Sequence, residues 1–157
     1  MGNRQVVERY ARAMAENNLD EQMSTLHEDF VVTYPQSGEV IRGSANLRAI
    51  VESYPATSGE GLAPTLERVT GTDDRWVTTP SFPAWTVVHL AGSGDEFTMT
   101  GRVTYPNGET WHAVAVITVR DGKIWRETDY FAAPFEAPEW RSAYVELNEE
   151  PAATTPS

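Results

Sequence analysis

The stretch Thr110–Phe131, TWHAVAVITVRDGKIWRETDYF, decides the fold. Its two halves are rich in valine, isoleucine, threonine and aromatic residues, which favour β-strands. Between them stands Asp121-Gly122, a dipeptide typical of a tight hairpin turn. The stretch therefore predicts two long antiparallel strands, Thr110–Arg120 and Lys123–Phe131.

Further strand-like segments precede this hairpin along the chain. Turn-forming residues, mainly glycine, proline, asparagine and aspartate, separate them. The segments are Phe30–Tyr34, Leu66–Thr70, Trp76–Thr79, Ala84–Ala91 and Glu96–Tyr105. Most of the chain after its first third is thus predicted to be a meander of antiparallel strands.

The first third of the chain has helical periodicity instead. A first helix places Val6, Val7, Tyr10 and Met14 on one face, a short second helix follows Asn18, and a third begins near Ser44. Helices followed by antiparallel strands indicate an α+β domain. The helices must cover one face of a strongly curved sheet, which leaves a cone with an open end where a ligand would bind.

The C-terminal region differs from the rest of the chain. Pro138–Leu147 is a short amphipathic segment, and residues 148–157 are acidic and then rich in proline, alanine and threonine. Such a composition favours disorder. We therefore expect one domain over residues 1–147 and a disordered tail over residues 148–157.

Composition excludes several classes of function. The chain of 157 residues has no cysteine, which rules out disulfides and thiolate nucleophiles, and its net charge of −11 disfavours nucleic acid and anionic membranes as partners. No apolar run is long enough to span a bilayer, and the histidines lack partners at metal-ligand spacing. We expect a cytoplasmic protein with no metal and no cofactor.

Several short motifs carry a resemblance to a known superfamily. Val6–Tyr10 with Asn18–Asp20 resembles the opening helices of ketosteroid isomerases and SnoaL-like polyketide cyclases. Ile41–Gly43 resembles the entry to their third helix, and Arg120–Ile124 with Asp129–Phe131 resembles the last hairpin of SnoaL-like proteins and limonene-epoxide hydrolases. The chain is thus similar, over most of residues 4–147, to the SnoaL-like branch of the nuclear transport factor 2-like superfamily.

The resemblance implies a cone-shaped α+β barrel. Three N-terminal helices would pack on a curved, mostly antiparallel sheet, with a short C-terminal helix. The superfamily contains isomerases, cyclases, dehydratases, hydrolases and non-catalytic domains, so the fold alone does not assign an activity.

The resemblance also implies candidate catalytic residues. The phenol that holds the oxyanion in ketosteroid isomerases falls at Tyr10, but their carboxylate base falls at Tyr34, and a phenol is a poor base at neutral pH. Steroid isomerisation by that mechanism is therefore not expected. In SnoaL-like cyclases an acid on the last strand works with a histidine on the neighbouring strand, and these roles fall at Asp129 and His112. Epoxide hydrolases would need a second acid where Thr104 stands.

The position of His112 depends on the hairpin register. A two-residue turn at Asp121-Gly122 would place Asp129 opposite Val114, with His112 on the same face. A three-residue turn with a glycine bulge would place Asp129 opposite Ala113, with His112 on the other face. The sequence leaves both registers open.

Other residues are candidates for ligand binding. Glu127 shares a face with Asp129, so the two could share a proton, or Glu127 could pair with an arginine. Bulky side chains on inward-leaning elements could line a pocket or fill the core: Met14, Tyr54, Phe82, Trp85 and Trp111. In the three-residue-turn register Ala113 and Ala115 would leave room for a flat hydrophobic molecule with one or two oxygens.

Three functions fit these features. The chain could be a cofactor-free acid–base enzyme acting on an apolar small molecule by cyclisation, isomerisation or dehydration. It could bind such a ligand without turnover, or it could be a protein-interaction domain. Because β-branched residues lie on the outer face of the sheet in either register, we also predict a two-fold homodimer through the sheet.

Overall fold

The predicted hairpin is present in a computed structural model that describes residues 2–53, 76–77, 84–105 and 109–148. Strand β6 (Thr110–Arg120) pairs antiparallel with β7 (Lys123–Ala132), and Arg120 lies opposite Lys123 across the turn. Asp121 and Gly122 have φ angles of 51° and 70°. Aspartate and glycine tolerate this left-handed conformation, so the dipeptide suits a two-residue hairpin turn.

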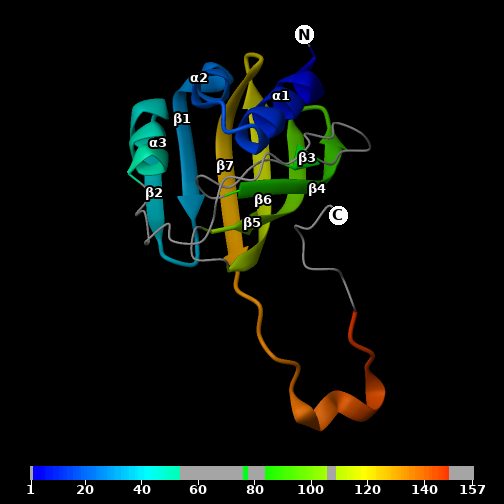
Figure 1. Cartoon of the computed structure of the whole chain (residues 1–157). Coiled ribbons are helices and arrows are strands. Elements are labelled where there is room, and N and C mark those ends of the chain that lie inside the picture. The colour runs from blue at the N-terminus through cyan, green and yellow to red at the C-terminus, as the bar shows by residue number, and fades with distance from the viewer. Residues whose placement is uncertain (1, 54–75, 78–83, 106–108, 149–157) are drawn as a thin grey trace.

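The hairpin lies at the centre of a seven-stranded sheet with the order β2-β1-β7-β6-β5-β4-β3 (Figure 1). The remaining strands are β1 (Leu26–Tyr34), β2 (Glu39–Arg42), β3 (Trp76–Val77), β4 (Ala84–Ser93) and β5 (Glu96–Thr104). All neighbours pair antiparallel except β1 and β7, which are parallel. The sheet is therefore mixed and mostly antiparallel.

The strand predictions differ from the structure in two places. Strand β2 was not predicted, because its four residues are too few to show a clear alternation. Strand β1 begins at Leu26, four residues before the predicted start at Phe30. The predicted strand Leu66–Thr70 lies outside the described residues.

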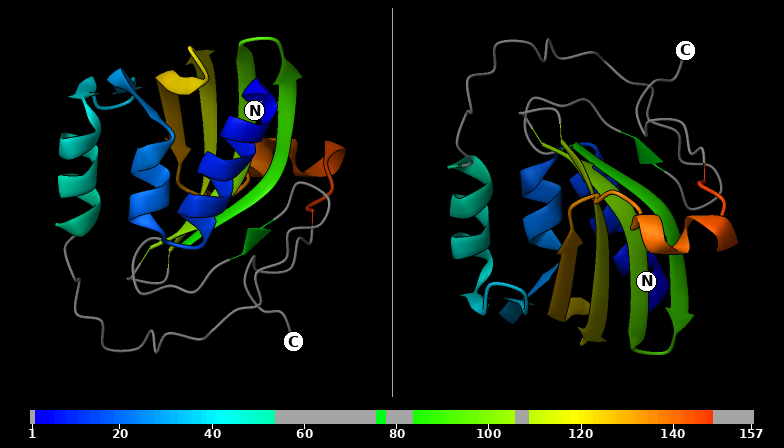
Figure 2. Two further views of the ribbon diagram at one scale, coloured as in Figure 1. Left: turned by 90° about the horizontal axis from the view of Figure 1, so that it is seen from above. Right: turned by 90° about the horizontal axis from the view of Figure 1, so that it is seen from below.

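Three helices cover the inner face of the sheet, which curves around α1 (Figure 2). They are α1 (Asn3–Ala15), α2 (Leu19–Ser24) and α3 (Ser44–Glu52). The side chain of Asn18 accepts a hydrogen bond from the backbone N–H of Glu21, so the predicted N-cap starts α2. No described helix combines the length and apolar character needed to cross a membrane.

The core lies between α1 and the sheet. Val7 on α1 is fully buried against the hairpin residues Ile117 and Ile124, together with Phe30 of β1 and Leu90 of β4. These residues fix the distance between helix and sheet at the narrow part of the cone. A 3-10 helix, η1 (Glu139–Tyr144), follows β7 and lies away from this core (Figure 1). The expected cone-shaped α+β fold is confirmed.

Candidate functional site

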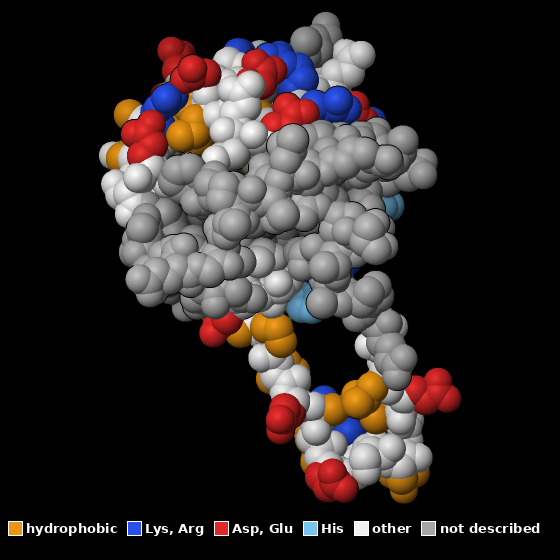
Figure 3. All heavy atoms as spheres, viewed as in Figure 1, with side chains coloured by type: hydrophobic (Ala, Val, Ile, Leu, Met, Phe, Trp, Pro, Cys, Tyr) orange, Lys and Arg blue, Asp and Glu red, His pale blue; other side chains and the backbone are white. Residues whose placement is uncertain are grey.

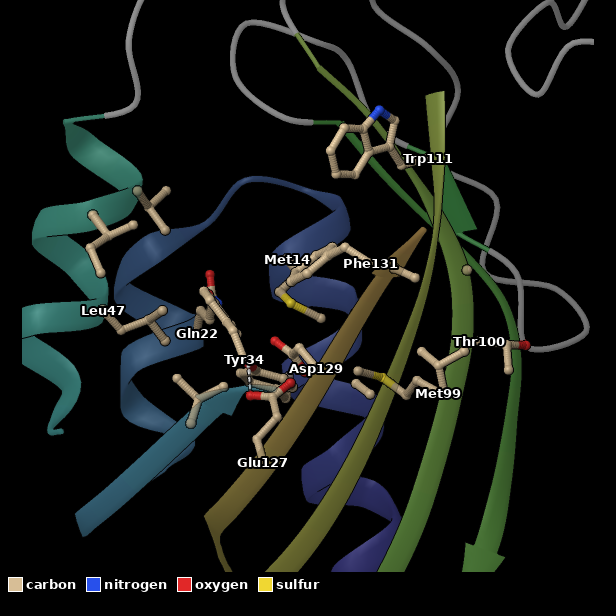
Figure 4. Close-up of a pocket in the computed structure, with 18 of the residues that line it drawn as sticks. Met14, Gln22, Tyr34, Leu47, Met99, Thr100, Trp111, Glu127, Asp129 and Phe131 are labelled. Atoms are coloured by element: carbon tan, nitrogen blue, oxygen red, sulfur yellow. Dashed lines mark hydrogen bonds between the residues drawn. The ribbon is translucent and has the colours of Figure 1, made fainter. Parts of the chain in front are cut away.

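A cavity of about 440 Å³ lies between the helices and the inner face of the sheet (Figure 4). This volume lies in the range of sites for small organic molecules. Apolar side chains from α1, α3 and the strands make up much of its lining, including Met14, Leu47, Ile50, Met99, Trp111 and Phe131. The predicted space between the helices and the sheet is therefore present.

Two carboxyl groups on β7 reach this cavity. Glu127 is only 4% exposed, and its Oε2 accepts a hydrogen bond of 2.6 Å from the hydroxyl of Tyr10 on α1. Asp129 lies two residues further on the same face, and Figure 4 shows both carboxyl groups beside Tyr34. Its Oδ1 is buried and has no hydrogen-bond partner among the described residues. An unpaired buried oxygen of this kind is costly unless a ligand or proton satisfies it.

Burial changes the acidity of both carboxyl groups. Loss of solvation raises the pKa of Asp129 well above its usual range, and the charge of Glu127 and a hydrogen bond with Glu127 raise it further. Burial also raises the pKa of Glu127, but hydrogen bonds with Tyr10 and Asp129 act in the opposite direction. Both carboxyl groups therefore hold a proton more readily than they would in water.

The two tyrosines of the site remain protonated hydrogen-bond donors. Burial and the nearby carboxyl groups raise the pKa of both Tyr10 and Tyr34. The Tyr10 hydroxyl donates its hydrogen bond to Glu127, whereas the Tyr34 hydroxyl has no hydrogen-bond partner within the described part of the chain. The Tyr34 ring packs edge-to-face on Phe131 at 5.3 Å between centroids. Tyr34 is thus held in place while its hydroxyl is available to a ligand.

Parallel pairing between β1 and β7 brings Tyr34 to Asp129. Val32 lies opposite Glu127, and Thr33 lies opposite Thr128. The next residue on each strand is Tyr34 on β1 and Asp129 on β7, so this register places Tyr34 beside Asp129. The two strands are separated by most of the chain, so no local pattern could reveal this pairing. The site therefore depends on a long-range contact.

The structure corrects the expectation that His112 faces the pocket. The turn has two residues, but a bulge at Trp125 shifts the register of β7, and Ala115 lies opposite Asp129. This register is neither of the two that were considered. His112 lies opposite Ala132, and its side chain is exposed on the outer face of the sheet. It cannot serve Asp129 from there.

The same strand register explains why the cavity is not filled by side chains. Ala113 and Ala115 both lie on the inner face and line the cavity. The sequence placed them there on the assumption of a three-residue turn, whereas the strand bulge is the actual cause. Their methyl groups fill little of the space below Met14.

Among the other candidates, Met14 and Trp111 line the cavity. The Trp111 ring packs on Tyr105 at 5.3 Å between centroids, and its Nε1 donates to Glu109 at 3.0 Å. Tyr54 and Phe82 lie outside the described residues, as does the side chain of Trp85.

Sequence reasoning missed several polar or aromatic residues at the cavity, among them Phe131, Gln36 and Gln22. Phe131 follows Asp129 at a spacing of two on the inner face, so strand alternation could have identified it. Gln36 accepts a hydrogen bond from the Phe131 backbone N–H and ties the β1–β2 turn to the end of β7. Gln22 of α2 is buried against the cavity. Nothing in the local sequence distinguishes these two glutamines from surface residues.

A family model described as "SnoaL-like domain" matches residues 7–127. The chain belongs to this family. The match ends at Glu127, so Asp129 lies just beyond the matched range. Comparison with curated proteins returned no match.

Solved structures extend the likeness to almost the whole SnoaL-like chain. An NTF-2 like protein of unknown function from Burkholderia xenovorans LB400 has 28% identity and a TM-score of 0.68, over 93% of this chain and 94% of that one. A proposed ketosteroid isomerase from Kribbella flavida DSM 17836 has 22% identity and a TM-score of 0.69, over 95% and 91%. TerC, co-crystallised with polyporic acid, has 19% identity and a TM-score of 0.59, over 82% and 90%. These likenesses establish the NTF2-like fold.

Proposed function

We propose that this SnoaL-like protein binds a hydrophobic small molecule with one or two oxygen atoms and moves a proton on it through Asp129, without a cofactor. The observation that carries the proposal is the buried Oδ1 of Asp129, which has no partner among the described residues and belongs to the cavity lining. A general acid or base must reach the reacting atom directly. Of the two buried carboxyl groups on β7, Asp129 is the one with an oxygen that lacks a partner among the described residues.

The carboxyl pair can accept and return one proton. In this proposal Asp129 and Glu127 hold one proton between them, in agreement with the raised pKa of both groups. When Oδ1 takes a proton from a carbon or oxygen of the substrate, the shared proton passes to Glu127, and the negative charge moves to the substrate. Returning a proton to a different atom gives isomerisation, and returning it to a departing hydroxyl gives dehydration. If the substrate anion attacks a carbonyl group within the same molecule before the proton returns, the product is a ring.

Two phenols have separate roles in this scheme. The Tyr34 hydroxyl lies where it can donate a hydrogen bond to the substrate oxygen and stabilise developing negative charge. Tyr10 acts through Glu127, to which it donates its hydrogen bond, and is a positioning residue. His112 has no part in the proposal because it lies on the outer face.

Binding without turnover is a second candidate, favoured by the largely apolar lining. The structure of TerC, which has the same fold, was determined from crystals grown with polyporic acid, and this supports a small-molecule ligand. Both candidates require the cavity, but only the first requires Asp129 to exchange a proton. The absence of metal and cofactor, and a cytoplasmic location, stay predictions.

A thermal-shift screen followed by turnover assays tests the proposal. Polyketide-like, terpenoid and steroid compounds are screened, because a ligand at about one hundred times its dissociation constant stabilises the fold by about 2.7 kcal/mol. We expect Ala115→Phe to fill the cavity and abolish the ligand-induced rise in melting temperature. Val116→Phe lies on the outer face of the same strand and should leave that rise unchanged. If no compound stabilises the protein, or if Ala115→Phe binds equally well, the cavity is not the binding site. If Asp129→Asn turns over a bound compound normally, the acid–base role is wrong.

A further inference from the structure

The residues after β7 form an arm that extends from the body of the protein. This C-terminal arm, residues 133–148, begins directly after the pocket strand and contains η1 (Figure 1). No residue of η1 is buried, and η1 has no extensive packing on any other helix or strand that the structure describes. Pro134 and Pro138 restrict the backbone of the first part of the arm.

The arm carries an unusual number of exposed apolar side chains. Trp140 is 78% exposed and Tyr144 is 86% exposed, and Phe135, Val145 and Leu147 are also exposed. Figure 3 shows apolar side chains along the arm below the body. Exposed apolar groups gathered on one segment indicate a protein interaction site.

The local structure of the arm also favours contact with a partner. Its 3-10 helix has only six residues. Helices this short are marginal in water by themselves, and 3-10 geometry forms weaker hydrogen bonds than an α-helix. Since no residue of η1 is buried, contacts with another surface would stabilise its conformation.

A fitting surface is present on the same chain. Val116 of β6 lies opposite Thr98 of β5 and Thr128 of β7, on the face of the sheet turned away from the pocket. Val116 and the neighbouring Tyr130 are both exposed hydrophobic residues. We define Thr98, Val116, Thr128 and Tyr130 as the outer-face patch. The patch carries no charge, so two copies of this acidic chain can approach here without opposing like charges.

We propose that the C-terminal arm packs on the outer-face patch of a second copy of this chain, with the two arms exchanged about a two-fold axis. The arm and the patch are continuous, because β7 carries Tyr130 and leads directly into the arm. A two-fold arrangement covers both arms and both patches at once, which a single different partner would not do. The inference goes beyond a dimer held by the sheet alone, because it assigns the arm as the exchanged element.

Size and charge agree with this arrangement. Phe135, Trp140 and Tyr144 can each bury roughly 150–250 Å². Together they approach the roughly 800 Å² per partner that a stable interface buries. The arm carries Glu136, Glu139 and Glu146 but only one arginine, whereas Arg102 lies in a row of the sheet beside the patch.

The first test compares two double variants of the full chain by sedimentation velocity. Trp140→Ser with Tyr144→Ser removes the aromatic contacts, and we expect the dissociation constant of the dimer to rise roughly 30-fold or more for each aromatic. The matched control, Ser142→Ala with Asn148→Ala, changes two exposed polar residues of the arm that the proposal does not use and should leave a dimer. A monomeric native chain at tens of micromolar, or a dimer unaffected by loss of both aromatics, would overturn the proposal.

The second test identifies what the arm contacts. Because the chain has no cysteine, single cysteines can be placed without background. Differently tagged chains with Ser142→Cys and His112→Cys are mixed and treated with a flexible bis-maleimide. We expect cross-linking between the two chains, and much less when His112→Cys is replaced by Ala49→Cys on the exposed side of α3. Equal cross-linking to Ala49→Cys would contradict the assigned surface. A cross-link within one chain that carries both Ser142→Cys and His112→Cys would show that the arm folds back on its own sheet.

Discussion

The inner face of β7 carries buried carboxyl groups, whereas its outer face carries an exposed aromatic side chain. On the inner face, Glu127 and Asp129 are carboxyl groups surrounded by a largely apolar cavity. On the outer face, Tyr130 is 46% exposed, beside the exposed Val116 of β6. Stability alone would favour the reverse arrangement, with apolar groups inside and charges outside. The comparison agrees with the two proposals, which assign the inner face to a small molecule and the outer face to a second copy of the chain.

The largest expected effect concerns the inner face. Asp129→Asn keeps the size of the side chain but removes the group that exchanges a proton, so we expect turnover to fall by roughly 100-fold or more. Binding of the same ligand, measured by thermal shift, should persist. Loss of binding together with turnover would instead show that Asp129 holds the ligand rather than acting on a proton.

Tyr10→Phe tests the buried hydrogen bond. The change removes the hydroxyl that donates to Glu127 at 2.6 Å and leaves a buried carboxyl oxygen without that donor. We expect the free energy of unfolding to fall by about 1–3 kcal/mol, measured by urea denaturation. An unchanged stability would mean that Glu127 finds another donor or holds its own proton.

The pH dependence of stability tests the raised pKa of Asp129. A carboxyl group whose pKa is raised by folding binds more protons in the folded state than in the unfolded chain. Its contribution to stability is therefore present below the unfolded pKa, about 3.8, and is lost as pH rises through the folded pKa.

The variant Asp129→Asn has no carboxyl group at this position, so its stability should not fall as pH rises through the folded pKa of Asp129. It should become more stable than the native chain as pH rises, by about 1.4 kcal/mol for each unit by which folding raises the pKa. Melting temperatures measured from pH 3 to 9 compare the two chains, with the exposed Asp29→Asn as the control. Parallel curves for the native chain and Asp129→Asn would refute the raised pKa.

The smallest expected effect concerns the outer face. Tyr130→Phe removes a hydroxyl from an exposed side chain, so the free energy of unfolding should change by less than about 0.5 kcal/mol. The measurement is the same urea titration used for Tyr10→Phe. A loss as large as that of Tyr10→Phe would mean that the two faces are not as different as the structure indicates.

Several features of the site could be predicted from the sequence. The Asp-Gly turn and the strand composition located β6 and β7, and strand alternation placed Glu127 and Asp129 on one face. Helical periodicity identified Tyr10 and Met14 as inward-facing residues of α1. These are local properties, since each depends on residues that are close together in the chain.

Only the tertiary structure decided how these residues meet. The bulge at Trp125 shifts β7 by one residue and leaves His112 on the outer face, because a turn sets the register only at its own end of a hairpin. Parallel pairing of β1 with β7 brings Tyr34 to Asp129, and packing of α1 brings the Tyr10 hydroxyl to Glu127 across 117 positions of sequence. The raised pKa of Asp129 arises from desolvation in the assembled core. The sequence determined which groups the site contains, whereas their contacts and acidity depend on long-range packing.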